Sequence, residues 1–133
     1  MRLPDWKARL NAFVTATARQ PYALGSHDCA LFAAGAVDAV CGIDPGKVWR
    51  GKYTTKAAGL RLVRKAGHQD HVAVFAAILD EVSTAFAAAG DIAVVDDAGT
   101  LLLGVVQGES IYVLRPTGLG LVPRAMMLRA FRT

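Results

Sequence analysis

The spacing of hydrophobic positions changes once along the chain, near Gly90. Before that point, apolar residues recur every three or four positions, which is typical of helices with one buried face. After it, short runs rich in Val, Ile and Leu are separated by Gly, Asp and Pro, which is typical of strands joined by turns. The pattern predicts an α+β fold in which N-terminal helices pack on a C-terminal antiparallel β-sheet.

Four helices are expected, and they cover residues 4–19, 28–41, 54–66 and 71–79. The second of these is apolar on all sides, which predicts a buried helix at the centre of the domain. Asp28 can cap its start and Gly42 can end it. The aromatic side chains expected in the core are Trp6, Phe13, Phe32, Phe75 and Phe86.

Five strands are expected after Gly90, and they form an antiparallel meander. They cover residues 92–95, 101–106, 111–114, 119–122 and 127–131. With 133 residues and no linker, the chain is expected to form a single domain, residues 1–133, with one core. Its parts are an N-terminal helix (1–19), a helical part with a cysteine (20–89) and the sheet (90–133).

Composition and charge exclude several classes of protein. The net charge is +4, and the basic residues are scattered, so the chain lacks the basic stripe of a nucleic-acid-binding protein. No apolar run approaches the ~18 residues of a membrane-spanning helix, so membrane insertion is not expected. Residues 1–7 lack the apolar centre of a signal peptide, which predicts synthesis in a cytoplasm.

The candidate chemistry centres on Cys29, which begins the buried helix directly after a loop that contains Gly25. The helix dipole and the free backbone N–H groups at such a position favour a thiolate and can bind an oxyanion. The alternative is that Cys29 is a small buried hydrophobic residue. Cys41 lies twelve positions further along the same helix, about 18 Å away, so a disulfide between the two is not expected.

This loop resembles the nucleophile motif of NlpC-like cell-wall peptidases, a branch of the papain-fold cysteine peptidases. The residues that carry the resemblance are Tyr22, Gly25, Asp28, Cys29 and Phe32. The resemblance implies a papain-like fold, with Cys29 as the nucleophile, Tyr22, Gly25 and Asp28 in support, and no cofactor. Asp28 itself is better suited to capping the helix than to catalysis.

Three later segments extend the resemblance over residues 20–132. Gly90-Asp91 and the strand after it resemble the Gly-Asp motif of the family, and residues 103–108 resemble its next strand and glycine turn. Residues 50–55 are similar to small phage proteins encoded among tail-tip genes, of the gene-transfer-agent type.

The sequence departs from this family at the catalytic base. The histidine of the family stands two residues before a strand glycine, and that position is Leu102 here. The third polar residue falls near Val113 or Leu114. An aliphatic side chain can neither hold a thiolate nor protonate a leaving amine, and loss of one triad member commonly slows such enzymes by about four orders of magnitude. Peptidase activity by the family mechanism is therefore not expected.

The three histidines are poor candidates to replace the missing catalytic base. His27 lies on the loop two residues before Cys29, and we expect it to be exposed or bound to a nearby carbonyl. His68 and His71 have helical spacing, but too few further ligands accompany them for a metal site. They are interpreted as the polar start of a helix, and no metal is expected.

Three functions follow as hypotheses. The first, implied by the resemblance, is a structural component of a phage tail tip or baseplate, made in the bacterial cytoplasm and carried in the virion, which docks on hub and distal-tail proteins. The second is a peptidoglycan endopeptidase of the tail with Cys29 as nucleophile and an atypical base. The third is an inhibitor-like or immunity binding module.

Overall fold

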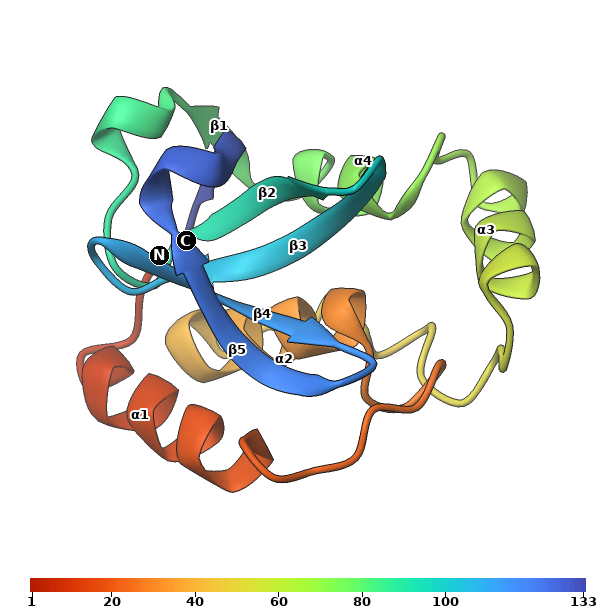
Figure 1. Ribbon diagram of the computed structural model, residues 1–133, viewed down its shortest axis with the longest axis horizontal. Coiled ribbons are helices and arrows are strands. Elements are labelled where there is room, and N and C mark those ends of the chain that lie inside the picture. The colour runs from red at the N-terminus through yellow and green to blue at the C-terminus, as the bar shows by residue number, and fades with distance from the viewer.

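In the computed structural model, which describes residues 1–133, a six-stranded antiparallel sheet follows four helices (Figure 1). The helices are α1 (Trp6–Thr17), α2 (Cys29–Cys41), α3 (Lys56–Lys65) and α4 (His71–Ala76). The strands are β1 (Asp80–Val82), β2 (Ile92–Asp97), β3 (Thr100–Val106), β4 (Ser110–Arg115), β5 (Gly118–Pro123) and β6 (Met127–Arg132). Two 3-10 turns, η1 (Thr84–Phe86) and η2 (Arg124–Met126), precede β2 and β6. The predicted α+β class and its four helices are confirmed.

The strand order in the sheet is β1-β6-β2-β3-β4-β5. Strands β2 to β5 form the expected meander, but β6 returns across the sheet to pair with β2, so the prediction of a simple meander is wrong for the last strand. The crossing segment is held by Arg124, whose guanidinium donates hydrogen bonds to the carbonyls of Thr84, Ala87 and Gly108. Strand β1, which the hydrophobic pattern did not predict, pairs with β6 at the edge.

Helix α2 forms the centre of the core, as its apolar composition predicts. It packs on β3 and β4 with one side and on α1 with the other. The α1 contact is close at Gly35, where an added Cβ would lie 2.5 Å from the Phe13 ring. That ring stacks on Phe32 with 5.4 Å between the ring centroids. Both ends of α2 are capped as expected, by the Asp28 side chain and by Gly42 in the left-handed conformation.

The two faces of the sheet belong to different hydrophobic clusters. Val94, Leu103 and Leu114 face α2 and α4 in the main cluster. Val95 and Val113, their neighbours along the strands, lie in a second cluster on the opposite face. Because side chains alternate along a strand, this register decides which β3 and β4 side chains face the start of α2.

A buried carboxylate, Asp91, joins the two ends of the chain, which Figure 1 shows near each other. It accepts hydrogen bonds from the Arg2 guanidinium at 2.9 Å, the Ala88 backbone at 2.8 Å and the Thr133 backbone at 3.0 Å. The Asp91 side chain is 2% exposed and that of Arg2 is 23% exposed. Asp91 therefore has a structural role in this chain.

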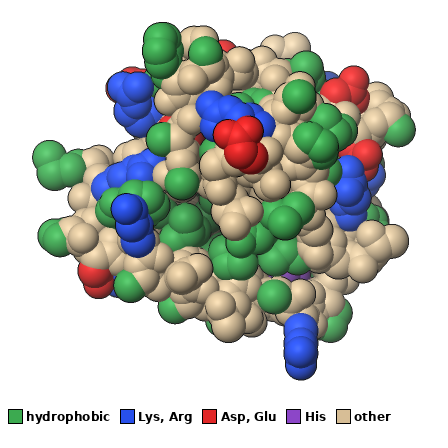
Figure 2. All heavy atoms as spheres, turned by 60° about the vertical axis from the view of Figure 1, so that its left-hand side comes forward, with side chains coloured by type: hydrophobic (Ala, Val, Ile, Leu, Met, Phe, Trp, Pro, Cys, Tyr) green, Lys and Arg blue, Asp and Glu red, His purple; other side chains and the backbone are tan.

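The molecular surface has scattered apolar positions. Figure 2 shows hydrophobic side chains at several places on one face, with Lys and Arg side chains separated from one another. Phe86, expected in the core, is 74% exposed, because it lies in a single 3-10 turn outside both hydrophobic clusters. None of the helices combines the length and the apolar character that crossing a membrane requires.

Replacing Asp91 with Ala is expected to lower the free energy of unfolding by about 2–4 kcal/mol, because it leaves buried donors without an acceptor. Urea unfolding of the two proteins measures the difference. The matched control is Glu81→Ala, which removes the exposed pair between Glu81 and Arg129 and is expected to change stability by less than about 1 kcal/mol. Equal losses in the two variants would contradict the structural role given to Asp91.

Candidate functional site

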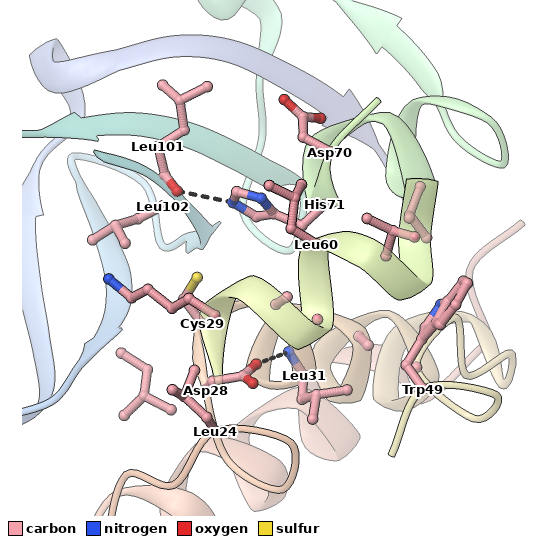
Figure 3. Close-up of a pocket in the computed structure, with 18 of the residues that line it drawn as sticks. Leu24, Asp28, Cys29, Leu31, Trp49, Leu60, Asp70, His71, Leu101 and Leu102 are labelled. Carbon is pink, nitrogen blue, oxygen red and sulfur yellow. Dashed lines mark hydrogen bonds between the residues drawn. The ribbon is translucent and has the colours of Figure 1, made fainter. Parts of the chain in front are cut away.

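A cavity of about 520 Å³ lies beside the start of α2 (Figure 3). Its walls come from the loop before α2, from α3 and α4, and from β3 and β4. Most lining side chains are apolar, including Leu24, Leu31, Trp49, Leu60, Leu101 and Leu102. A concave, largely apolar site of this size is typical of ligand-binding sites.

Asp28 fixes the geometry of the loop at the floor of this cavity. Its buried carboxylate accepts hydrogen bonds from the backbone of Leu31 at 2.9 Å and of Gly25 at 3.0 Å, and from the Tyr53 hydroxyl. Gly25 has φ +85°, and a side chain there would collide with the Tyr53 carbonyl. The cap predicted for Asp28 is confirmed, and Gly25 is required by both its backbone conformation and the close approach of Tyr53.

Both tyrosines near this loop are held in the neutral form. Burial raises the pKa of Tyr53, and its hydrogen bond to Asp28 raises it further. Burial also raises the pKa of Tyr22, which lines the cavity, and the negative charge of Asp28 adds to this. Tyr22 and Tyr53 can therefore supply hydroxyl groups to the site, but neither is a base near neutral pH.

Cys29 lies at the cavity wall with its sulfur directed toward β3 (Figure 3). Both cysteines are free, as expected. The backbone of Leu103 and Ala30 favours the charged form of the Cys29 sulfur and so lowers its pKa, against the effect of burial. No side-chain nitrogen is hydrogen-bonded to this sulfur.

The pKa of the Cys29 thiol is raised, whereas a position at a helix start is expected to lower it. Burial raises the pKa of its thiol to about 11; the negative charge of Asp28 adds to this, while the Leu103 hydrogen bond and the positive charge of Lys56 oppose it. The helix-start argument for a thiolate is therefore wrong here, because desolvation exceeds the local stabilisation of negative charge. The thiol is protonated at neutral pH.

The position predicted for the family base, Leu102, lies at the same cavity as Cys29. Leu102 lines the cavity, but it packs against the second hydrophobic cluster, whereas Leu101 and Leu103 on either side belong with the main cluster next to α2. Of the two positions considered for the third polar residue, Leu114 lines the cavity and Val113 faces away from α2. All of these side chains are aliphatic.

His71, interpreted from the sequence as part of a polar helix start, lies in the same cavity as Cys29. His71 begins α4, and Figure 3 shows its ring above Cys29 and directed at β3. Its Nε2 lies 2.9 Å from the Leu101 carbonyl oxygen. Because a carbonyl can only accept, Nε2 carries the proton in this hydrogen bond, so Nδ1 is the ring nitrogen left to accept one; no hydrogen bond joins Nδ1 to the Cys29 sulfur. No local signal indicated this placement, since it depends on packing of α4 against β3.

The other two histidines do not line this cavity. His27 is buried, with Nε2 lacking a hydrogen-bond partner and its ring edge-on to Phe32, so the expectation of an exposed loop residue is wrong. His68 packs edge-on against Trp49. The structure brings together no group of three or more His, Cys, Asp or Glu side chains that could hold a metal ion.

The reactivity of the half-buried Cys29 should reflect the raised pKa of its thiol. In a Cys41→Ser background, we expect iodoacetamide to modify Cys29 at pH 7.5 about a hundredfold more slowly than N-acetylcysteine, because the thiolate is the reactive form. The rate should rise with pH toward a midpoint near the pKa of about 11. Mass spectrometry of quenched samples gives the rates, and a midpoint below pH 8 would contradict the assigned thiol state.

The buried His27 predicts a loss of stability in mild acid. Burial lowers the pKa of His27, and a weaker attraction to Asp28 opposes this. The unfolded state therefore binds the proton more readily, so stability is retained above about pH 6.5 and falls as the pH decreases below it, by at most about 1.4 kcal/mol per pH unit.

Urea unfolding of wild type and of His27→Gln between pH 7.5 and 5.5 isolates this contribution, since glutamine does not titrate. We expect wild type to lose more stability than the variant over this range. Parallel pH profiles for the two proteins would show that His27 has the same pKa in the folded and unfolded states, which would contradict the prediction.

Comparison with known proteins gives a match to one family model. No curated protein matches the sequence. The family model of a domain of unknown function, DUF6950, matches residues 1–133, the whole chain. The chain therefore belongs to the DUF6950 family.

Proposed function

We propose that this chain is an NlpC-like domain of papain type that has lost its peptidase chemistry and acts by binding, as a structural component of a phage tail tip or baseplate. Its partners in this proposal are other tail proteins of the virion, such as the hub and distal-tail proteins. The phage assignment rests on the sequence resemblance of residues 20–132, including residues 50–55.

The layout of the domain is compatible with this proposal. A cysteine begins the central helix, that helix packs on an antiparallel sheet, and the Gly-Asp pair precedes the first strand of the meander. Tyr22 and Asp28 line one cavity with the cysteine, and the backbone N–H of Gly25 donates a hydrogen bond to Asp28.

The observation that carries the loss of catalysis is the state of the Cys29 thiol. Its pKa is raised to about 11, chiefly by burial, and no side-chain base is hydrogen-bonded to it. A cysteine peptidase needs a thiolate together with an acid that protonates the leaving amine. This site provides an apolar cavity with an unreactive thiol, which suits binding.

The second candidate, a peptidoglycan endopeptidase, is favoured by one observation. His71 and Cys29 line the same cavity. The Nε2 hydrogen bond to the Leu101 carbonyl leaves Nδ1 of His71 as the nitrogen that could act as base, and this base would have to come within hydrogen-bond distance of the Cys29 sulfur. In this alternative, His71 replaces the missing histidine of β3.

Hydrolysis of peptidoglycan separates the two candidates. We expect the purified protein to release no new amino groups from peptidoglycan, and Cys29→Ala phage particles to remain infectious. The chain itself should be recovered from purified virions, which also distinguishes it from an immunity module. An active NlpC-like endopeptidase assayed in parallel is the positive control.

Release of amines that is abolished both by Cys29→Ala and by His71→Gln would establish the endopeptidase and overturn the binding proposal. Release that survives both substitutions would point to a contaminating hydrolase, and repurification would then have to remove it for the proposal to stand.

A further inference from the structure

The positive charge of the chain is concentrated in one segment, although its basic residues look scattered along the sequence. Residues 45–69 contain seven of the fifteen Lys and Arg residues and none of the eleven Asp and Glu residues. The rest of the chain has eight basic and eleven acidic residues, a charge of −3, whereas the whole chain has a net charge of +4. This segment therefore supplies all of the net positive charge.

The segment forms one side of the molecule. It comprises the end of the loop after α2, helix α3 and the turn after it, and Figure 1 shows α3 away from the sheet. Six of its seven cations are exposed and form no ion pair, and we call them the basic surface. They are Lys47, Lys52, Lys56, Arg61, Arg64 and Lys65. On the face in Figure 2, which brings the other side of the molecule forward, Lys and Arg side chains lie apart from one another.

The carboxylates near the segment do not balance this charge. Asp44 pairs with Arg50, the seventh cation, at 3.1 Å, and Asp70 is half-buried and caps α4. With both counted, residues 44–70 still have a charge of +5. Lys56 and Arg64 also line the cavity, where carboxylates balance them, but the other four cations of the basic surface do not line it. The excess positive charge thus lies outside the cavity.

The cations of α3 lie close enough to repel one another. Arg61 precedes Arg64 by three positions and Lys65 by four, and residues at these spacings are neighbours on the surface of a helix. Like charges at these spacings destabilise a helix, and α3 contains no carboxylate to offset them. A partner with closely spaced negative charges would remove this repulsion.

The apolar residues of the segment distinguish between kinds of anionic partner. A helix that binds a membrane surface turns its apolar face outward, but Leu60 and Val63 of α3 line the cavity. A protein interface has an apolar centre, but Val48 is the single large apolar side chain that is exposed in this segment. A nucleic acid needs neither feature, since duplex DNA carries one negative charge per about 1.7 Å of its axis and cations alone can contact its phosphates.

From these observations we propose that the basic surface binds the phosphate backbone of a nucleic acid without reading its sequence. The segment exposes no aromatic side chain that could stack on a base, since Trp49 and Tyr53 are half-buried. This proposal reverses the expectation from the sequence that the chain binds no nucleic acid. It is independent of the proposed tail function and of the chemistry of Cys29.

A labelled DNA duplex tests the inference with the full chain. Fluorescence anisotropy of a fluorescein-labelled duplex of about 20 base pairs gives Kd at NaCl concentrations from about 50 to 200 mM. We expect micromolar binding at the lowest salt, and log Kd should rise with log salt concentration with a slope of about 3 to 5, because three to six phosphates are neutralised. A duplex of unrelated sequence should bind equally well.

Paired substitutions locate the binding surface. Arg61→Gln combined with Lys65→Gln removes two cations that do not line the cavity. We expect this variant to bind about tenfold more weakly at the lowest salt, with a salt slope lower by about 2. The matched control is Arg19→Gln combined with Arg132→Gln, which changes the net charge equally at exposed positions outside the segment and should leave the slope unchanged. Circular dichroism verifies that both variants remain folded.

Three results would overturn the inference: no binding of the duplex at the lowest salt, a wild-type salt slope in the variant of α3, or an equal effect of the control variant. Poly-L-glutamate that displaces the duplex at an equal concentration of charges would identify an acidic protein surface as the partner instead. Tighter binding to phosphatidylserine-containing vesicles than to the duplex would identify a membrane surface. None of these results concerns peptidoglycan or the recovery of the chain from virions, which test the proposed function separately.

Discussion

The site depends on one buried carboxylate. Asp28 accepts hydrogen bonds from the backbone that begins α2, from the glycine turn before it and from the Tyr53 hydroxyl of the following loop. These bonds fix where Cys29 begins the helix and hold the loop that leads to α3. The same negative charge, after burial, raises the pKa of the adjacent Cys29 thiol. The interaction that builds the cavity thus also disfavours the thiolate that a peptidase would need.

Loss of the thiolate and retention of the cavity are physically compatible. Protonation removes the nucleophile but leaves an apolar surface that α3, α4 and the sheet enclose on several sides. His71 uses its Nε2 proton to join α4 to β3 through the Leu101 carbonyl, which stabilises one wall of this cavity. A polar residue that could serve catalysis therefore serves the shape of the site in this structure.

Local signals predicted the elements of the fold well, and long-range contacts explain what they missed. The caps Asp28 and Gly42 act within one turn of helix, so the sequence indicated both ends of α2. Residues 80–82 are mostly polar and become a strand only by pairing with β6, so no local pattern indicated β1. For the site, the helix start suggested a thiolate at Cys29, but burial under other elements decided its pKa. His71 joins the cavity through the packing of α4 on β3, which the sequence does not encode locally.

The protonation state of Cys29 is the most direct test of an unreactive site. Cysteine labelled with ¹³C at Cβ, in a Cys41→Ser background, reports thiol ionisation through its NMR shift as the pH is raised. The structure predicts a single transition with a midpoint near 11, with the His71 imidazole signals unchanged across it. A midpoint below 8 that is coupled to a shift of the His71 ring would reveal a thiolate–imidazolium pair and contradict the account.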